Sequence, residues 1–248
     1  MTGRRFKTAF ILGAGLGTRL RPLTENVPKP LLPINGRPMI TYAMDHLLSI
    51  GVERFIVNTH HYPEKYSEAF PARAWRGVPI ELRYEPTLLD TGGGLKNVED
   101  LLQDDEAIVC YNGDILCTMP LDALVKAHEG SNCEATLALR TQGPNLNVDI
   151  DLSGAICDMR RRLQKPGAAA CLFTGIYTVE TSLLSAIDKG RIESIVEVFL
   201  RRIVADPGSI RGAIIDSGEW DDIGSADIYE RLAGQSSHPE KRGHPHEL

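Results

Sequence analysis

A glycine-rich, basic segment directly after a short apolar run constrains this chain more than any other part of the sequence. Residues 10–38 read FILGAGLGTRLRPLTENVPKPLLPINGRP. Gly13, Gly15 and Gly17 alternate with small or apolar residues, which allows a tight turn and brings backbone N–H groups close to a ligand. Clusters of such N–H groups bind anions. The segment therefore predicts an anion site at the end of a buried strand.

Fixed positive charge follows the glycines in the same segment. Arg19 and Arg21 offer planar guanidinium groups and Lys29 offers a compact ammonium group. Four prolines restrict φ in this loop, which lowers the entropy lost when a ligand orders it. The first 40 residues hold seven Lys or Arg against one Glu, although the whole chain has a net charge of −6. This distribution favours a small polyphosphate over a nucleic acid, which the acidic remainder would repel.

Two common phosphate-binding motifs do not fit this segment. A Walker loop requires Lys and then Ser or Thr after its last glycine, and no Lys follows Gly17. A dinucleotide fingerprint requires a third glycine where this chain has Thr18. The loop therefore predicts a different kind of nucleotide or phosphate site.

The segment resembles the signature of the sugar-1-phosphate nucleotidylyltransferases, G-x-G-x-R-L-x-P-L-T followed by P-K-P and G-x-P-M. The matching residues are Gly15, Gly17, Arg19, Leu20, Pro22, Leu23, Thr24, Pro28, Lys29, Pro30, Gly36, Pro38 and Met39. The resemblance covers about residues 7–232 and implies transfer of a nucleoside monophosphate from an NTP to a sugar 1-phosphate. It implies catalytic roles for Arg19 and Lys29 at the phosphates. The nucleotide contacts that it implies in this loop are Leu12, Gly13, Ala14, Gly15, Gly17 and Thr18.

Strand and helix patterns alternate along the first half of the chain. Apolar runs typical of strands buried on both faces of a parallel sheet lie at residues 7–12, 55–57, 80–84 and 107–111. Helical spacing begins at Pro38 and again at Pro63. This order predicts an α/β fold with a Rossmann-like, doubly wound, mixed and mostly parallel sheet, and a ligand at the carboxyl ends of the strands. Alternation in residues 148–156, with a turn at Ser153-Gly154, predicts a small antiparallel appendage.

A second glycine cluster, residues 85–94, reads EPTLLDTGGG and precedes a helix that we expect to start near Leu95. Three consecutive glycines cost conformational entropy, and close approach of a ligand would explain them. A flexible linker is the alternative. The resemblance implies that this segment frames the nucleotide base, with Glu85, Thr91, Gly92 and Gly93 as nucleotide-binding residues.

Two aspartates are the candidates for a metal site. Asp114 follows an apolar strand and a glycine, and Mg²⁺ binds one or two carboxylates together with waters and phosphate oxygens. An Asx turn is the alternative. The resemblance implies Asp222 as the second Mg²⁺ carboxylate, because Trp220 to Ser225 matches the family's W-x-D-x-G-[ST]. Either Asp222 or its neighbour Asp221 could instead cap the following helix.

The resemblance also implies a sugar site in the second half of the chain. Lys165 matches the Lys of the family's E-K-P, which contacts the acceptor phosphate, but Gln164 stands where the family has Glu. Thr174 and Gly175 match T-G-I-Y, and Asn112 of N-G-D completes the expected sugar-binding set. We interpret Arg160 and the two arginines after it as a solvated face.

The form T-G-G-G is most similar to short bacterial N-acetylmuramate-1-phosphate uridylyltransferases, so we expect UTP and N-acetylmuramate 1-phosphate or a related hexose 1-phosphate. Three alternatives stay open. One is a GTP-dependent mannose- or heptose-1-phosphate guanylyltransferase. The others are a cytidylyltransferase acting on a small alcohol phosphate, and a noncatalytic homologue that binds a nucleotide sugar and regulates a partner.

Length and composition predict one domain over residues 1–233. The resemblance implies that it is a nucleotidyltransferase domain with a nucleotide-binding part to about residue 114 and a sugar-binding part over 115–233. Residues 234–248 are polar and read as a disordered tail. No apolar run approaches the roughly 20 residues that a membrane span needs, and the five scattered cysteines predict free thiols. We therefore expect a cytoplasmic protein without membrane or nucleic-acid partners, as a monomer or small homo-oligomer.

Overall fold

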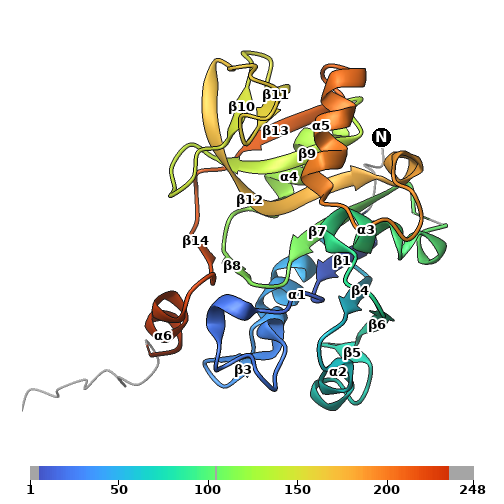
Figure 1. Ribbon diagram of the computed structural model, residues 1–248, viewed down its shortest axis with the longest axis vertical. Coiled ribbons are helices and arrows are strands. Elements are labelled where there is room, and N and C mark those ends of the chain that lie inside the picture. The colour runs from blue at the N-terminus through green and yellow to red at the C-terminus, as the bar shows by residue number, and fades with distance from the viewer. Residues whose placement is uncertain (1–5, 104, 235–248) are drawn as a thin grey trace, which may run out of the picture.

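A ten-stranded mixed sheet forms the centre of the computed structural model, which describes residues 6–103 and 105–234 (Figure 1). Its strand order is β11-β10-β12-β7-β1-β4-β6-β5, and β9 joins β12 to β13. The strands are β1 (Thr8–Leu12), β4 (Arg54–Thr59), β5 (Ala74–Trp75), β6 (Val78–Tyr84), β7 (Ala107–Asn112), β9 (Ala135–Arg140), β10 (Val148–Ile150), β11 (Ile156–Met159), β12 (Ala169–Glu180) and β13 (Ile210–Ile214). This arrangement confirms the predicted mixed α/β fold.

Strands β7, β1, β4 and β6 pair in parallel and are the four apolar runs recognised in the sequence. Strand β13 also pairs in parallel with β9. Strand β1 lies in the middle, where Phe10 pairs in register with Ile56 on one side and Cys110 on the other. All three residues are fully buried. The same register places Leu12 beside Asn58 and Asn112 at the carboxyl ends of the strands.

The antiparallel part is larger than the predicted appendage. The 12-residue strand β12 runs antiparallel to both β7 and β9, and its first residues pair with β10. The hairpin of β10 and β11 has the antiparallel pairing that the alternation predicted. Two short ladders lie outside this sheet: β2 (Pro33–Ile34) with β3 (Arg37–Pro38), and β8 (Ile115–Cys117) with β14 (Trp220–Asp222).

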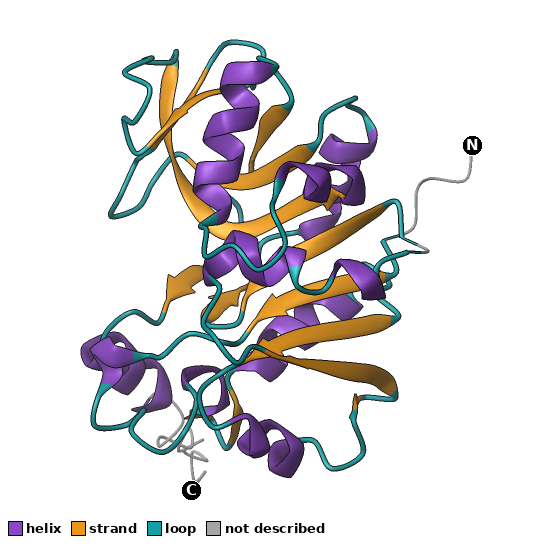
Figure 2. Ribbon diagram, turned by 45° about the vertical axis from the view of Figure 1, so that its right-hand side comes forward, coloured by secondary structure: helices purple, strands orange, loops and turns teal. Residues whose placement is uncertain are grey.

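Helices cover both faces of the sheet, as a doubly wound fold requires (Figure 2). They are α1 (Ile40–Leu48), α2 (Pro63–Ala69), α3 (Asp90–Lys96), α4 (Leu121–Glu129), α5 (Ile195–Ala205) and α6 (Ala226–Gly234), with 3-10 turns at Thr18–Leu20, Lys29–Leu31, Glu99–Leu101 and Thr181–Ala186. Buried residues of α3 and α5 join one apolar cluster with Phe10, and those of α1, α2 and α4 join another with Ile11. Alternate residues of β1 thus contribute to opposite clusters.

Two predicted helix starts were wrong. Helix α1 begins at Ile40, because Pro38 belongs to the short β3 strand. Helix α3 begins at Asp90, so the three glycines lie inside the helix and not in a loop before it. In both places the tertiary neighbours of the segment outweigh local propensity.

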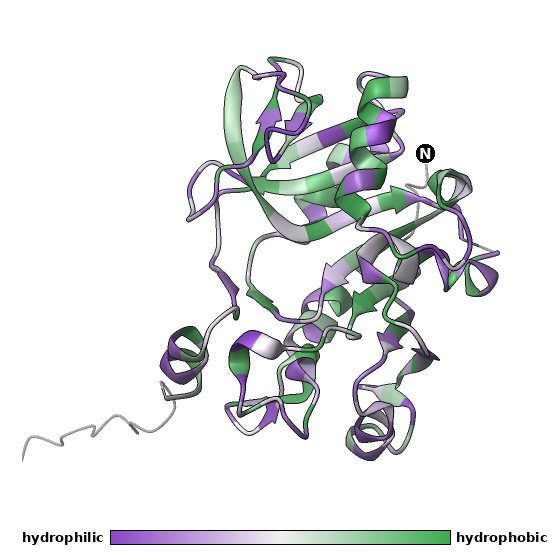
Figure 3. Cartoon of the chain, in the orientation of Figure 1, coloured by the Kyte–Doolittle hydropathy of each residue, from purple (hydrophilic) through white to green (hydrophobic). Residues whose placement is uncertain are grey.

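Hydrophobic residues run through the central strands (Figure 3). Within residues 6–103 and 105–234, no helix has the length and apolar character that a bilayer span requires. The five cysteines are free thiols, three of them buried, as predicted. The predicted tail lies outside the described residues except for Gly234, which ends α6.

Candidate active site

The first glycine segment is anchored at one end and open at the other. Gly13 N–H donates to Asn58 Oδ1 at 2.8 Å, and the Gly13 carbonyl accepts from the Tyr66 hydroxyl at 2.8 Å. A Cβ on Gly13 would lie 2.7 Å from the Asn58 carbonyl oxygen, so packing explains this glycine. A Cβ on Gly15 would meet no atom within 4 Å. Gly15 is therefore the glycine whose bare backbone faces open space.

A cavity of about 360 Å³, which we call the Lys29 cavity, lies at the carboxyl ends of the parallel strands. It is lined by Leu12, Ala14, Gly15, Lys29, Pro30, Asn58, Leu88, Asp90, Thr91, Asn112, Asp114 and Ile192. A neighbouring cavity of about 300 Å³ shares Gly15, Lys29 and Asp114 and adds Gly17, Thr18 and Arg19. The structure thus brings most of the predicted loop residues to one place. Sequence reasoning missed Asn58, Leu88, Asp90 and Ile192.

The second glycine cluster packs against another chain segment. Gly92 and Gly93 N–H groups donate to the Glu193 carbonyl at 2.8 and 3.0 Å. A Cβ on Gly93 would lie 2.2 Å from the Arg191 carbonyl oxygen. Neither Gly92 nor Gly93 lines the Lys29 cavity or either of the two cavities beside it. Chain packing therefore explains these two glycines better than close approach of a ligand. Thr91 does line a cavity, and its Oγ1 accepts from Ile195 N–H at 2.8 Å.

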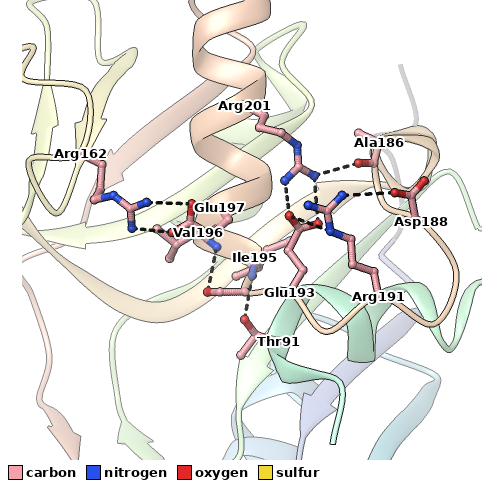
Figure 4. Close-up of polar contacts among 11 residues, drawn as sticks. Thr91, Arg162, Ala186, Asp188, Arg191, Glu193, Ile195, Val196, Glu197 and Arg201 are labelled. Carbon is pink, nitrogen blue, oxygen red and sulfur yellow. Dashed lines mark hydrogen bonds and ion pairs between the residues drawn. The ribbon is translucent and has the colours of Figure 1, made fainter. Parts of the chain in front are cut away.

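The buried carboxylate of Glu193 holds in place the segment that packs against these glycines (Figure 4). Glu193 is 7% exposed and forms ion pairs with Arg201 and Arg191, while Arg201 also donates to the Ala186 carbonyl at 3.0 Å. The hydrogen bond from Arg201 to Glu193 outweighs the effect of burial and raises the pKa of the guanidinium. Ser194 caps α5 by accepting from Val196 N–H at 3.3 Å. Helices α3 and α5 are thereby fixed against each other.

Glu85 is fully buried and supports both glycine segments. Its Oε1 accepts from Asn58 Nδ2 at 2.8 Å and its Oε2 accepts from Leu89 N–H at 3.0 Å. Because Asn58 also holds Gly13, a chain of hydrogen bonds joins the first loop to the second. Glu85 lines none of the cavities at this end of the sheet, and its hydrogen bonds give it the position of a support, while its contact with the base stays a prediction. The missed residue Asn58 had one sequence signal, a polar side chain at the end of a buried strand.

Lys29 and Asp114, which both line the Lys29 cavity, form an ion pair. Lys29 lies in the 3-10 turn Lys29–Leu31 between two prolines and is 8% exposed. Asp114 follows β7 and is contributed by a different part of the chain. A nearly buried ammonium group in contact with a carboxylate is a fixed local charge, which salt in the solvent screens little.

Asp222 lies beside Asp114 on the neighbouring short ladder. It pairs with Ile115 across β14 and β8, and Ile223 N–H donates to the Asp114 carbonyl at 3.1 Å. Its Oδ1 is buried without a hydrogen-bond partner. Burial and then the charge of Asp114 raise the pKa of Asp222 above its usual value, and Lys29 and Arg19 oppose that rise.

Arg19 completes this cluster, because a Cβ on Gly224 would lie 2.9 Å from its Nη1. Asp221, by contrast, forms an ion pair with Arg231 of α6. The neighbouring carboxylates 221 and 222 therefore have different partners. Of the predicted catalytic set, the structure gathers Arg19, Lys29, Asp114 and Asp222.

The two carboxylates fit a magnesium ion. No group of three or more candidate metal ligands occurs in the part of the chain that the structure describes. Mg²⁺ requires only one or two carboxylates when waters and phosphate oxygens fill the other positions. The unpartnered Oδ1 of Asp222, next to a second carboxylate, is the buried oxygen that a cation would satisfy.

A larger cavity of about 900 Å³, which we call the Thr174 cavity, adjoins the first and shares Asp90, Thr91 and Asn112 with it. Thr174, Gly175 and Asn112 from the predicted sugar set line it, together with Arg19 and Asp222. Gly175 has φ +79°, and a Cβ there would lie 2.5 Å from Asn112 Nδ2. The missed residue Trp220 fixes this wall by donating from Nε1 to the Thr174 carbonyl at 2.9 Å.

Lys165 and Gln164 lie apart from these residues. Both are exposed and line none of the cavities, and the Lys165 N–H donates to Asp158 Oδ2 at 3.2 Å. Arg160 is exposed, as the interpretation of a solvated face predicted, and it also lines the Thr174 cavity. Arg162 agrees with that interpretation and forms a surface ion pair with Glu197 (Figure 4).

The chain is similar to known proteins over almost its whole length. The family described as "Nucleotidyl transferase" matches residues 8–236. Mannose-1-phosphate guanylyltransferase of Mycobacterium tuberculosis is 30% identical over 95% of this chain and 67% of its own length. UTP–glucose-1-phosphate uridylyltransferase of Synechocystis is 29% identical over 91% of this chain and 62% of its own length. The chain spans between 51% and 67% of the length of these and similar curated relatives.

Solved structures share the fold at lower identity. HddC from Yersinia pseudotuberculosis superposes with a TM-score of 0.75 at 19% identity, covering 93% of this chain and 99% of the other. The inositol-1-phosphate CTP transferase from T. maritima superposes with a TM-score of 0.76 at 20% identity, covering 94% and 97%. At these identities the likeness concerns the fold.

Proposed function

Because the chain belongs to the nucleotidyl transferase family, we propose that it transfers a nucleoside monophosphate from an NTP to a sugar 1-phosphate and releases pyrophosphate. One observation carries the proposal. Asp222, with an unpartnered buried oxygen, lies beside the Lys29–Asp114 pair and Arg19 where two cavities adjoin. The Lys29 cavity would hold the NTP and the Thr174 cavity the acceptor.

The chemistry needs no side-chain nucleophile. A phosphate monoester is largely dianionic near neutral pH, because its second pKa is about 6. One of its oxygens attacks the α-phosphorus, a new P–O bond forms, and the bond to the bridging oxygen of pyrophosphate breaks. The protein must bring two anions together in line and neutralise their charge. Lys29 would neutralise the nucleotide phosphates, and Arg19 would stabilise the departing pyrophosphate.

Asp114 and Asp222 would hold a Mg²⁺ ion at the junction of the cavities. When bound, Mg²⁺ supplies charge neutralisation between donor and acceptor phosphates. Asp222 has to be ionised for this role, and a bound cation would offset the burial and the Asp114 charge that raise its pKa. The ion pair with Lys29 would hold the Asp114 carboxylate in place.

We place GTP first as donor, with mannose 1-phosphate or a related hexose 1-phosphate as acceptor. Mannose-1-phosphate guanylyltransferases reach 30% identity to this chain. UTP is the second candidate, because a relative named as a uridylyltransferase is 29% identical. We therefore place UTP with N-acetylmuramate 1-phosphate, the pair expected from the T-G-G-G form, after GTP. Presence of Arg19, Lys29 and both aspartates together favours an enzyme over a noncatalytic regulator.

The proposal includes one domain over residues 1–233, divided at about residue 114. The Lys29 cavity supports this division, because all but one of its lining residues precede position 115. Most residues that line the Thr174 cavity follow that position. We keep a monomer or small homo-oligomer as the expected assembly.

Pyrophosphate release across four NTPs and several sugar 1-phosphates, with Mg²⁺ present, tests the proposal. We expect release only when one NTP and one sugar 1-phosphate are present together, with GTP the best donor. Release of pyrophosphate without an acceptor, or none with any pair, would overturn it.

A further inference from the structure

We infer that Arg160 recognises a carboxylate on the acceptor sugar, away from its 1-phosphate, so that among the hexose 1-phosphates an acidic sugar is preferred to neutral ones such as mannose 1-phosphate. The inference rests on the proposed function and names the substrate class of the Thr174 cavity. It begins with a position. Arg160 follows directly after β11, adopts a left-handed φ of +56°, and lines the cavity that also contains Thr174 and Asp222.

The backbone places Arg160 far along this cavity from the catalytic cluster. Arg160 N–H donates to the Asn147 carbonyl at 2.6 Å, and Asn147 N–H donates to the Cys171 carbonyl at 2.9 Å. Arg160 also lines a smaller cavity of about 360 Å³ together with Pro144, Asn145 and Asn147, and none of Arg19, Lys29, Asp114 and Asp222 lines that cavity. With the 1-phosphate near Asp222, Arg160 therefore meets the far side of the sugar.

The charges around Arg160 favour an anion there. The other residues lining that end of the cavity are neutral: Gly143, Pro144, Asn145, Asn147, Met159, Leu172 and Phe173. The acidic residues that line the cavity are Asp90, Asp221 and Asp222, and Asp221 already pairs with Arg231. Within the described chain, no ion pair is found for the Arg160 guanidinium, whereas that of Arg162 is bound by Glu197.

Chemistry then selects the group. A guanidinium presents a planar set of donors that matches a carboxylate with two parallel hydrogen bonds. Sugar hydroxyls can be read by neutral amides, which Asn145 and Asn147 already supply on the same wall. A fixed cation is useful there when the sugar carries its own negative charge.

Two matched pairs of acceptors test the inference with the full chain. Glucose 1-phosphate is compared with glucuronate 1-phosphate, and N-acetylglucosamine 1-phosphate with N-acetylmuramate 1-phosphate. Each pair differs by a carboxylate-bearing group. We expect kcat/KM to favour at least one acid over its neutral partner, and Arg160→Gln to reduce that preference about tenfold or more while the neutral sugar changes less than about twofold. Arg161→Gln, beside it but outside this cavity, is the control and should keep the preference.

Calorimetric measurement of binding with the same pairs of acceptors tests the role of Arg160 without catalytic turnover. Stronger binding of an acid that is lost in Arg160→Gln, in a protein that releases no pyrophosphate, would support the inference while the proposed function fails. An equal loss for acid and neutral sugars would mean that Arg160 contacts the 1-phosphate, which overturns the inference. No preference for either acid in the wild-type protein, or no change in Arg160→Gln, would overturn it as well.

Discussion

Lys29 and Asp114 form an ion pair in the wall of the Lys29 cavity, although 85 positions separate them in the chain. The pair joins the basic loop after β1 to the carboxyl end of β7. It therefore couples the proposed phosphate-binding segment to the proposed metal-binding carboxylate. Substitution at either end should affect nucleotide use before it affects the fold, because Lys29 lies in a 3-10 turn, Asp114 lies in the turn after β7, and both lie outside the apolar clusters.

Lys29→Ala should raise the KM for the NTP by about tenfold or more, because a nearly buried charge-assisted contact to phosphate is lost. Steady-state kinetics with the NTP varied would measure this. Lys65→Ala, which removes a surface lysine paired with Glu68, is the matched control. Unchanged kinetics in Lys29→Ala would mean that the lysine serves only the structure.

Gly93→Ala should destabilise the fold by about 2 kcal/mol or more, because the new Cβ would overlap the Arg191 carbonyl oxygen. Gly15→Ala should leave the free energy of unfolding within about 0.5 kcal/mol, since no atom lies within 4 Å of its Cβ. Chemical denaturation measures both. Because Gly15 lines the Lys29 cavity, Gly15→Ala should still weaken nucleotide binding. A stable Gly93→Ala protein would contradict the packing explanation of the second glycine cluster.

Asp45→Asn should lower stability by about 1 kcal/mol at neutral pH. Burial alone would raise the pKa of Asp45, but hydrogen bonds from Arg76, Arg37 and Trp75 outweigh it and hold the pKa below the usual 3.8. A carboxyl group whose pKa is lowered by folding stabilises the fold at pH values above its pKa in the unfolded state. This stabilisation disappears as the pH falls through the pKa of the group in the folded state.

The difference between wild type and Asp45→Asn should therefore be constant above about pH 5 and shrink below about pH 4. Urea unfolding at a series of pH values measures it. Asp100→Asn removes a more exposed carboxylate paired with Arg83 and should have a smaller effect. A difference that grows on acidification would show that the sign is wrong.

Asp222→Asn should not lower the melting temperature of the protein in chelator. The ionised carboxylate is unfavourable there, because burial and the charge of Asp114 raise its pKa, so the neutral amide removes a cost at neutral pH. Thermal unfolding with EDTA, and then with Mg²⁺ and NTP, measures the effect. Stabilisation by Mg²⁺ with NTP should be present in the wild type and lost in the variant. A strongly destabilised variant in EDTA would indicate a structural role for Asp222.

The parallel strands could be predicted from the sequence because their signal is local. Residues such as Phe10 and Ile56 lie in continuous apolar runs, and burial on both faces produces that pattern. The role of Gly93 could not be predicted in this way. Gly93 is needed because the Arg191 carbonyl leaves no room for a Cβ at this position. Arg191 lies about a hundred positions away in sequence, and only the fold brings the two residues into contact.

The same distinction between local sequence signals and contacts made by the fold applies to the candidate site. Arg19, Lys29, Asp114 and Asp222 could be named because each lies in a short, specific motif. The supporting position of Glu85 and the place of Arg160 in the wall of the Thr174 cavity could not be named in this way. The burial of Glu85 depends on Asn58, and the place of Arg160 depends on how β11 pairs with β10, so neither is encoded in nearby residues.

The neighbouring carboxylates 221 and 222 allow the central claim to be tested by a single measurement, the rate of pyrophosphate release from saturating NTP and sugar 1-phosphate with Mg²⁺. Asp222→Asn removes the carboxylate with the unpartnered oxygen, and Asp221→Asn removes the one that pairs with Arg231. We predict that Asp222→Asn lowers the rate about a hundredfold or more, while Asp221→Asn stays within about fivefold of wild type. Wild-type turnover in Asp222→Asn would contradict the account.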